Sequence, residues 1–486
     1  MLSYSEVLAR LADERSGQTA ITQLRRGSAA HTVTWEELRR VADAGAAWLV
    51  ASGVRPGDLV PNLLGNGWEA IAANFAIWRA GGCPLPLDPN SATDALRGIL
   101  ELVHAEVVLA HGPVLGLRVG TPEVMTQGTA GRSARLPAGL VAPHRKAIAT
   151  SGTTRSPRVV VNQGRAELGA SRTAIMDTVY GSLGMQTDQR QLIVASLSHN
   201  MGFDLAHFGL LAGHQLVLAP TLLPEDLFDL VRDYQIQYVG VPPYYLQRTV
   251  GLLLHRREEL ATLEAIKHSG SVCPVQVKST WLAALGSERV FESYGMTEGY
   301  GRTVISGPEW LEHPGSVGRP WKSEAVVLGP SGPLPLGQVG RIAFTDLSGS
   351  QSVVLGDFAS IESVSGHHAT DDLGRLDDQG YLYLAGRATE TVNVLGLQVS
   401  LPEVEAVVRN HPAVVDCLVG LDATGQLTAL VVLSASAVAR LSSKLRSHCL
   451  AHLNPHEVPM QFREVATIPR NAAWKPDRSL ATALMN

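Results

Sequence analysis

The sequence predicts an α/β fold, with a large N-terminal domain of layered sheets and helices, a β-rich subdomain and a small α+β C-terminal domain. Up to about residue 290, apolar residues at helical spacing alternate with short apolar runs, which is typical of sheets covered by helices. From about residue 315 the pattern changes to short strands and turns, and a further unit follows Gly386-Arg387. We therefore expect an N-terminal domain over residues 1–387 and a C-terminal domain over residues 388–486.

The composition is that of a globular protein, since 45% of the 486 residues are hydrophobic, 17% are charged and the net charge is −5. No basic run supports nucleic-acid binding. The four cysteines are scattered without a CxxC pair, which favours neither a disulfide framework nor a zinc site and suits a reducing compartment. The N-terminus lacks a signal-peptide pattern, and no uninterrupted apolar segment reaches the ~18 residues that span a bilayer. We expect a cytoplasmic protein with no membrane partner.

The first elements are predicted from capping and periodicity. Thr34 can cap a helix, with Glu37 three residues later as in a capping box, and apolar residues follow at helical spacing. Leu59–Leu64 reads as a strand, and a second helix is expected over about Trp68 to Ala80, ending at a glycine pair.

The same alternation continues toward residue 290. We expect a long helix over about Ala166 to Leu183 and another that opens at Ser198–Gly202. Four short apolar runs are strand candidates: Gln191–Ala195, Leu216–Leu218, Tyr238–Val241 and Val290–Tyr294.

The later part of the chain is richer in strands. Its expected strands are Val326–Leu328, Gly340–Phe344, Gly380–Leu384, Val415–Val419 and Leu427–Leu433. In the C-terminal domain we also expect a helix over Pro402–Arg409, another helix after the last strand, and an irregular tail.

The stretch Ala149–Arg158 gathers hydroxyl side chains around Gly152 between the apolar runs Lys146–Ala149 and Val159–Val161. This predicts a strand, a loop and a second strand. Glycine lets the backbone approach a polyphosphate closely, and hydroxyl and amide groups donate to its oxygens. The alternative is an ordinary Ser/Thr-rich turn.

Six motifs along the chain favour the phosphate-binding interpretation. They are Thr150–Arg158, Ser293–Glu298, Thr370-Asp371-Asp372, Gly386-Arg387, Gly396–Glu405, and Ile468–Arg470 with Lys475. In this order they resemble the motifs of the adenylate-forming enzymes: acyl- and aryl-CoA synthetases, adenylation domains of nonribosomal peptide synthesis, and luciferases. The resemblance covers essentially the whole chain and implies that the C-terminal domain is mobile, rotating between two half-reactions.

The resemblance implies that a carboxylate attacks the α-phosphate of ATP, giving an acyl-AMP and pyrophosphate, after which a thiol takes the acyl group. Because an anion approaches a polyanion, such a site needs cations and oriented donors. The residues implied to bind the nucleotide are Thr150, Ser151, Gly152, Thr153, Thr154, Arg158, Ser269, Gly270, Ser271, Tyr294, Gly295, Met296, Asp372 and Arg387. Among them, Tyr294 matches the ring stacked on adenine and Asp372 the acceptor for the ribose hydroxyls.

The catalytic residues implied by the resemblance are Lys475, Thr297 and His199. Lys475 matches the mobile cation that meets the carboxylate and the α-phosphate, and Thr297 matches the donor to that phosphate. Glu298 matches the Mg²⁺ ligand.

Several positions depart from the family pattern, namely Arg155, Asp371, Thr389, Asn393 and Trp474. Trp474 and Arg155 replace glycines, so their loops are not equally free. The departures leave open a second class of function, that of a degenerate homologue which binds nucleotide or acyl-adenylate without turnover.

The acid is expected near His199, Asn200, Asp204 and Gly270. In relatives that activate α-amino acids, an aspartate stands thirteen residues before the glycine of a Leu-Leu-x-Gly stretch, and in this chain that position is Asn200. An amide cannot pair an ammonium, and His199-Asn200 resembles the His-Asn of relatives that activate aryl acids. Asp204 either takes an amino or hydroxyl group on the ring or belongs only to the first turns of its helix.

We therefore expect a substituted benzoate or similar aryl acid. The first alternative is a medium or long aliphatic acid, because His199–Gly202 also resembles the His-Asp-Met-Gly of fatty acyl-AMP ligases. An α-amino acid ranks third. We expect no carrier domain after Asn486 and therefore a separate thiol acceptor, either CoA or the phosphopantetheine of a carrier protein.

Overall fold

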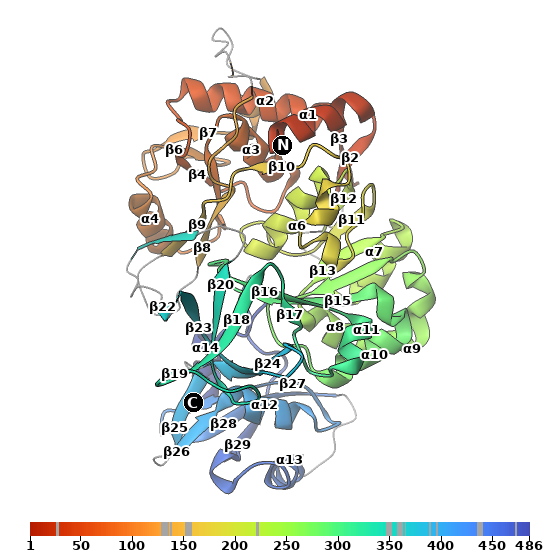
Figure 1. Ribbon diagram of the computed structural model, residues 1–486, viewed down its shortest axis with the longest axis vertical. Coiled ribbons are helices and arrows are strands. Elements are labelled where there is room, and N and C mark those ends of the chain that lie inside the picture. Colours follow the sequence, from red (N-terminus) through yellow and green to blue (C-terminus); the bar gives the residue numbers. More distant parts are fainter. Residues whose placement is uncertain are drawn as a thin grey trace.

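The largest sheet has nine strands in the described part of the chain and runs through the middle of the N-terminal domain (Figure 1). In spatial order they are β17 (Arg319–Pro320), β16 (Arg302–Ser306), β15 (Val290–Gly295), β14 (Ala265–His268), β13 (Tyr238–Val241), β11 (Arg190–Ile193), β12 (Gln215–Leu218), β2 (Thr19–Gln23) and β3 (His31–Thr34). Neighbouring strands from β15 to β2 are parallel, and antiparallel strands close both edges. Because helices cover a parallel sheet on both faces, β13 and β14 are buried along their whole length.

The computed structural model describes residues 1–25, 29–127, 136, 139–150, 158–219, 223–346, 352–356, 363–364, 366–387, 390–394, 397–434, 441–471 and 474–486. Two helical groups make its principal cores. The first contains α1 (Tyr4–Arg15), α2 (Trp35–Ala51), α3 (Trp68–Arg79) and α6 (Asn200–Leu211). The second contains α7 (Leu227–Asp233), α8 (Pro243–Thr249) and α10 (Val275–Leu285).

Two smaller sheets complete the N-terminal half. One is parallel, with β5 (Cys83–Pro86), β4 (Leu59–Asn62), β6 (Val107–Leu109) and β7 (Arg118–Gly120). The other is antiparallel, with β21 (Ser352–Leu355), β9 (Arg158–Asn162) and β8 (Lys146–Thr150). Two helices, α4 (Thr93–Leu102) and α5 (Pro122–Gln127), lie in this region, and α11 (Gly307–Glu312) follows β16.

The expected β-rich subdomain is a six-stranded sheet of β19 (Gly332–Pro333), β18 (Ser323–Gly329), β20 (Gly340–Asp346), β23 (His367–Leu376), β22 (Ser363–Val364) and β24 (Leu382–Arg387). Here β24 pairs antiparallel with β23, which places Arg387 directly opposite Asp372. Two of the sequence motifs are thereby brought together by strand register.

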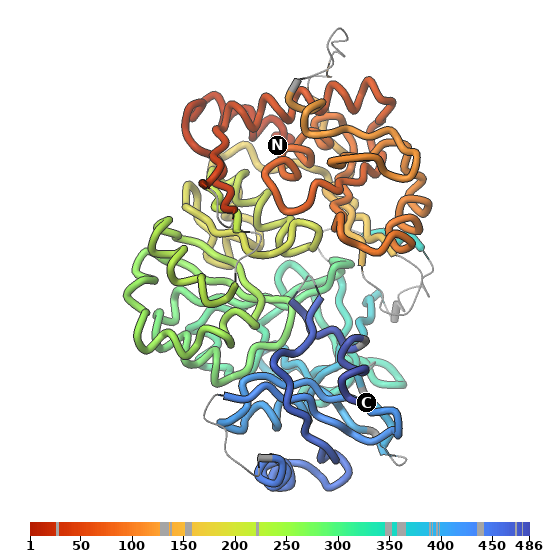
Figure 2. Tube along the Cα trace, turned by 180° about the vertical axis from the view of Figure 1, so that it is seen from behind, coloured from red at the N-terminus to blue at the C-terminus, as the bar shows by residue number. Residues whose placement is uncertain are grey.

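The C-terminal domain lies at the other end of the molecule from α1 and α2 (Figure 1). Its elements are β25 (Thr391–Val394), β26 (Leu397–Ser400), α12 (Leu401–Arg409), β27 (Val414–Leu421), β28 (Leu427–Leu433), α13 (Leu441–Leu450), β29 (Gln461–Glu464) and α14 (Arg478–Met485). Figure 2 shows the dark-blue final segment extending from this domain toward the green and teal strands of the N-terminal domain. The predicted boundary falls beside residues 388–389, which lie outside the described residues, and it stays a prediction.

Most of the predicted elements are confirmed. Thr34 caps α2, its Oγ1 accepting from the backbone amide of Glu37 at 3.1 Å, and β4, α3 and α12 fall where they are expected. The apolar runs around the predicted phosphate loop form β8 and β9, which pair antiparallel. These elements depend on local signals, namely caps and apolar periodicity, which the sequence carries directly.

The prediction of a long helix over Ala166–Leu183 is wrong. Glu167–Leu168 instead form a short strand, β10, paired with β1 (Leu2–Ser3), and two 3₁₀ turns follow at Ala174–Asp177 and Gly181–Leu183. Hydroxyl groups compete with helical hydrogen bonding here, since Thr178 Oγ1 donates to the carbonyl of Ile175 at 2.6 Å. Gly181 also approaches Met176 so closely that a Cβ would lie 2.4 Å from its carbonyl oxygen.

The prediction of an irregular tail is also wrong, because residues 478–485 form α14. Asp477 caps this helix by accepting from the amide of Leu480 at 3.1 Å. The buried side chains of Ala481 and Met485 pack against β27 and β28. Within the described residues, no helix combines the length and apolar character that a membrane span requires.

Candidate active site

Helix α6 begins at the carboxyl end of the central sheet, and His199 occupies its N-cap position. The preceding loop is held by Asn66, whose Oδ1 accepts from the amide of Leu197 at 2.8 Å. The helix starts so close to this loop that a Cβ on Gly202 would lie 2.2 Å from the carbonyl oxygen of Ser196. Asn200 follows as the first residue of α6, so two of the four predicted acid-binding residues, His199 and Asn200, stand at this helix start.

Asp204 lies one turn further into α6 and is 6% exposed. It pairs with Lys146 of β8, and its Oδ2 accepts from Tyr180 Oη at 2.7 Å. Burial acts to raise the pKa of Asp204, but the charge of Lys146 and the two hydrogen bonds lower it overall, so Asp204 is ionised. Because each carboxylate oxygen already accepts a hydrogen bond, the geometry suits the interpretation in which Asp204 belongs to the helix packing. A role toward a ring substituent stays a prediction.

The motif Ser293–Glu298 begins in the last residues of β15 and lies beside the β-rich subdomain. Tyr294 Oη donates to Asp372 Oδ2 at 2.6 Å, and Arg387 Nε donates to Oδ1 of the same carboxylate at 2.8 Å. Burial and the charge of Asp372 raise the pKa of Tyr294, which keeps its hydroxyl protonated as the donor. The structure therefore brings three predicted nucleotide-binding residues into one hydrogen-bonded group.

Thr297 and Glu298 follow in a turn closed by a hydrogen bond from the amide of Gly299 to the carbonyl of Met296, at 3.2 Å. Gly299 has φ +74°, a left-handed conformation that glycine adopts without strain. This turn exposes part of both side chains, since Thr297 and Glu298 are only half-buried.

Lys475 reaches this group from the C-terminal domain. Its side chain is exposed, yet nearby protein groups act on its ammonium: partial loss of hydration lowers its pKa, the charge of Arg387 lowers it further, and the charges of Asp372, Glu298 and Glu390 oppose the shift. The charge of Lys475 also lowers the pKa of His199, after the larger effect of burial. These charge effects indicate that His199 and Lys475, two predicted catalytic residues that are far apart in the sequence, lie near one site.

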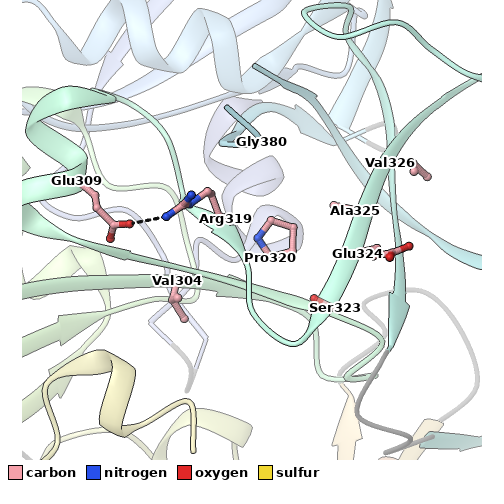
Figure 3. A pocket seen from close by; sticks show the side chains of 9 residues that line it. All are labelled: Val304, Glu309, Arg319, Pro320, Ser323, Glu324, Ala325, Val326 and Gly380. Atoms are coloured by element: carbon pink, nitrogen blue, oxygen red, sulfur yellow. Dashed lines mark hydrogen bonds and ion pairs between the residues drawn. The ribbon is translucent and has the colours of Figure 1, made fainter. Parts of the chain in front are cut away.

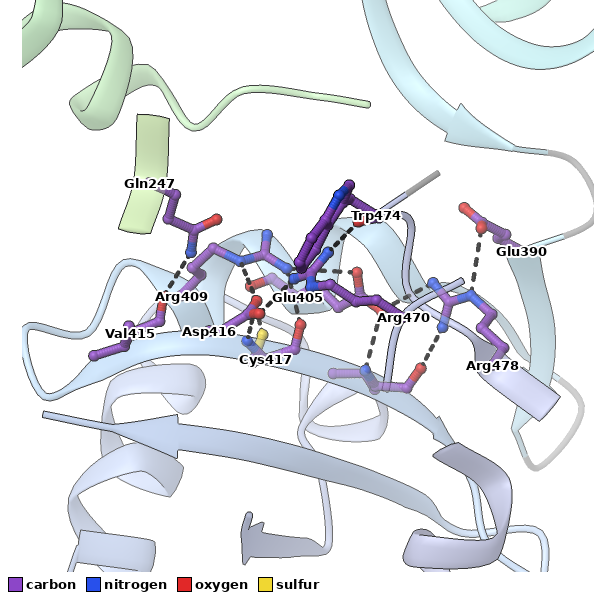
Figure 4. A network of polar contacts seen from close by, with 11 residues as sticks. Gln247, Glu390, Glu405, Arg409, Val415, Asp416, Cys417, Arg470, Trp474 and Arg478 are labelled. Carbon is purple, nitrogen blue, oxygen red and sulfur yellow. Dashed lines mark hydrogen bonds and ion pairs between the residues drawn. The ribbon is translucent and has the colours of Figure 1, made fainter. Parts of the chain in front are cut away.

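The neighbouring Trp474 makes the contact that holds Lys475 here. Its ring stacks on Tyr244 of α8 at 5.2 Å between centroids, and the Arg470 guanidinium lies 4.1 Å from the same tyrosine ring. Figure 4 shows Trp474 beside Arg470, whose Nη1 donates to the carbonyl of Trp474 at 2.8 Å. Gln247 Nε2 donates to the carbonyl of Val415, which joins α8 to β27.

The structure describes one of the two predicted nucleotide-binding loops, Ser269–Ser271, and only the ends of the other, Thr150–Arg158. Ser269–Ser271 follow β14, and Ser269 Oγ donates to Met201 Sδ at 3.3 Å, so this loop adjoins the start of α6. Thr150 and Arg158 are partners in the β8–β9 ladder, at the base of the predicted phosphate loop. Ser151, Gly152, Thr153, Thr154 and Arg155 lie outside the described residues.

Three residues that the sequence reading missed lie near the predicted acid site, namely Lys146, Lys267 and Arg302. Lys267 is 5% exposed on β14, and Arg302 is the first residue of β16, opposite Gly295. A lysine inside the apolar run Ala265–His268 was a usable signal, because buried lysines are rare.

A pocket of about 590 Å³ lies beside the ion pair of Arg319 with Glu309, and Figure 3 shows the side chains that line it. Its other lining residues are Val304, Pro320, Ser323, Glu324, Ala325, Val326 and Gly380. None of the residues predicted to bind nucleotide or acid lines this pocket, so it is separate from the candidate active site.

Two family descriptions match the chain. "AMP-binding enzyme" matches residues 8–349, and "AMP-binding enzyme C-terminal domain" matches residues 403–475. The fold and the two matches are those of an AMP-binding domain followed by a small C-terminal domain. The chain belongs to the AMP-binding enzyme family, within the superfamily of adenylate-forming enzymes.

Similar proteins include a 2-succinylbenzoate–CoA ligase of Geobacillus kaustophilus, 26% identical over 91% of this chain and 91% of the ligase. A delta-poly-L-ornithine synthetase of Acinetobacter baumannii is 26% identical over 99% of this chain. The chain spans only 36% of that synthetase and between 8% and 42% of three further curated relatives. Among solved structures, an o-succinylbenzoate CoA synthetase from Bacillus subtilis with its acyl-adenylate has a TM-score of 0.79 and 22% identity, covering 98% of this chain and 97% of that one.

Proposed function

We propose that this protein uses ATP to convert a carboxylic acid, an aryl acid such as a substituted benzoate, into an acyl-AMP and pyrophosphate, and then transfers the acyl group to a thiol. The observation that carries the proposal is the electrostatic coupling of Lys475 to this site: the charges of Arg387 and Asp372 act on Lys475, and the charge of Lys475 acts on His199, although these residues come from separate segments and from both domains. The stacking of the adjacent Trp474 on Tyr244 supports the same placement of Lys475. Ionisable groups with shifted pKa values gather at functional sites, which supports a catalytic role for this lysine.

In the first step, an oxygen of the acid carboxylate forms a bond to the α-phosphorus of ATP while the bond to pyrophosphate breaks. Lys475 reduces the repulsion between the two anions and balances the negative charge that develops on the α-phosphate. Thr297 donates to an α-phosphate oxygen. Asp372, held by Tyr294 and Arg387, accepts from the ribose hydroxyls and orients the nucleotide.

Glu298 is the proposed magnesium ligand. Among the described residues no three His, Cys, Asp or Glu side chains are grouped to hold a metal. A single half-buried carboxylate nonetheless fits Mg²⁺, which is commonly bound by one or two carboxylates together with substrate phosphates. When bound, the ion neutralises phosphate charge.

The choice of an aryl acid as the substrate is supported by Asn200 at the start of α6. Its side chain is an uncharged amide, which cannot pair with the ammonium group of an α-amino acid. A relative named 2-succinylbenzoate–CoA ligase supports the same class of substrate.

In the second step a thiolate attacks the acyl carbon and AMP leaves. CoA and a carrier protein's phosphopantetheine are both proposed acceptors. The four cysteines are buried and free, which suits the proposed cytoplasmic location.

ATP–pyrophosphate exchange across hydroxy-, amino- and carboxybenzoates, aliphatic acids and α-amino acids tests the proposal. We expect one aryl acid to dominate, Asn200→Ala to weaken that exchange and Lys475→Ala to abolish it. Dominant exchange with lauric acid would instead support a fatty acyl-AMP ligase. Absence of exchange in a folded protein that still binds ATP would support a binding homologue.

A further inference from the structure

Lys267 is a buried cation that has no carboxylate partner among the described residues. It is the third residue of β14, its neighbours on both sides are buried, and its Nζ donates to Ser269 Oγ at 2.9 Å. An ammonium group that is removed from water normally pairs with a carboxylate, because a hydroxyl dipole compensates the lost hydration only in part. The position therefore favours an anion that the chain itself does not supply.

Arg302 is a second cation that has no carboxylate partner among the described residues. It pairs through its backbone with Gly295, within the Tyr294–Glu298 motif, and its side chain is half-buried. Within the described ranges its guanidinium takes part in no hydrogen bond or ion pair. Its positive charge acts on Lys267 and, together with the larger effect of burial, lowers the pKa of that lysine to about 8.

The nearby buried carboxylate cannot neutralise this pair. Asp204 already binds Lys146 and Tyr180 through its two oxygens. Its charge acts on Lys267 to raise the pKa, yet the opposing effect of burial is larger. Lys146 binds Asp204, and Lys267 and Arg302 both interact electrostatically with this single ionised acid, which leaves an excess of positive charge in this part of the molecule.

The excess charge lies next to the proposed acid site. Lys267 contacts Ser269, Ser269 contacts Met201, and Met201 follows Asn200 at the start of α6. We propose that Lys267 and Arg302 bind a second anionic group on the acid substrate, so that the substrate is an aryl dicarboxylate or an equivalent dianion. This inference rests on the proposed function and names the substrate class of the same site.

The chemistry of the two cations supports this assignment. A guanidinium presents parallel N–H donors that match a carboxylate or sulfonate, and the ammonium adds a compact point charge. Both groups only donate, so they repel the ammonium of an amino acid and gain nothing from an alkyl chain. An acid with one carboxylate would enter the site and leave two cations unpaired, which disfavours its binding.

The test uses pairs of acids with the same shape and different charge. Benzene-1,3- and benzene-1,4-dicarboxylate are compared with their mono-amides, 3- and 4-carbamoylbenzoate, in ATP–pyrophosphate exchange. We expect kcat/KM to favour the better diacid over its own mono-amide by about tenfold or more, the gain typical of a charge-assisted bidentate contact. Lys267→Met and Arg302→Met should each reduce exchange with the diacid and leave the mono-amide unchanged or improved. Lys444→Met, which removes an exposed lysine on α13, is the control and should change neither.

The failure of this inference differs from the failure of the proposed function. Efficient exchange with hydroxy- or aminobenzoates, together with no preference for a diacid over its mono-amide, would contradict the proposal that the substrate is a dianion. The proposed adenylating function would be retained in that case. If no acid supports exchange, diacid binding is measured by the rise in melting temperature of the full chain. A rise with the diacid that exceeds that with the mono-amide, and that is lost in Lys267→Met, supports the anion site. Equal rises overturn it.

Discussion

The ring of Trp474 lies parallel to that of Tyr244, at 16° and 5.2 Å between centroids, and thereby joins the C-terminal domain to α8 of the N-terminal domain. Trp474 has φ +59°, a left-handed conformation that a bulky residue adopts only when its surroundings hold it there. The next residue is Lys475. The stacking therefore holds the proposed catalytic lysine toward the nucleotide site.

Trp474→Gly tests this role. Glycine adopts the same φ without strain, so the substitution removes the stacking and keeps the turn. Because such an aromatic pair contributes about 0.5–1.5 kcal/mol, we expect exchange to fall by about two- to tenfold. The thioester-forming step, measured with preformed acyl-AMP, should be unchanged or faster.

Tyr244→Ala supplies the matched comparison for this pair. If the two rings act through their contact, the double variant Trp474→Gly with Tyr244→Ala should lose no more activity than the single variants. Additive losses would show that Trp474 acts through something other than Tyr244.

The Asp372 carboxylate is the common acceptor of Tyr294 and Arg387. Asp372→Asn removes the charge that organises both donors and that is proposed to hold the ribose. We expect KM for ATP to rise about tenfold or more, because charge-assisted hydrogen bonds are lost. Asp371→Asn, an exposed neighbour on the same strand, is the control and should leave KM within about twofold. Equal effects of both substitutions would remove Asp372 from the nucleotide site.

The buried pair of Lys146 with Asp204 predicts a change in stability. Asp204→Asn leaves Lys146 without its counter-charge, and breaking a buried ion pair in this way costs about 3–5 kcal/mol. We expect urea unfolding to show this loss. The double variant Lys146→Met with Asp204→Asn should recover part of it, since no unpaired charge remains in the pair. If Asp204→Asn keeps full stability and loses only acid binding, Asp204 is a substrate ligand and not a packing residue.

The lowered pKa of the buried Lys267 leads us to expect that the stability of the protein depends on pH. Its pKa is lowered from 10.5 to about 8 by burial, so near neutral pH the folded protein carries an unfavourable buried charge. This cost is fully present below about pH 8 and disappears as pH rises from there toward the ordinary lysine value, because the unfolded chain then binds more protons than the folded one. Lys267→Met should therefore stabilise the protein by about 3 kcal/mol at about pH 7 and roughly half as much at about pH 9.5.

The measurement is the difference in urea unfolding free energy between Lys267→Met and the parent protein at the two pH values. A difference that is independent of pH would show that Lys267 is not a strained charge. A loss of stability at about pH 7 would mean that the lysine already has a compensating partner.

The sequence by itself determined the α/β class, the helices and strands that have clear caps or apolar periodicity, and the order of the motifs. Thr34 and its helix, and the apolar strands around the predicted phosphate loop, were readable because caps and periodicity act between residues that are close in the chain. The Ala166–Leu183 segment was misread because β10 is stabilised by a pairing with the first residues of the chain, which no local pattern reveals.

Only the tertiary structure decided which side chains meet. It brought Asp372 opposite Arg387 through strand register, stacked Trp474 on a helix about 230 residues earlier in the chain, and gathered Lys267 and Arg302 beside one occupied carboxylate. Whether a charge has a partner depends on groups distant in sequence and on how far water is excluded. Motifs therefore predicted the nucleotide chemistry, whereas the charge around the proposed acid site became visible only once the chain was folded.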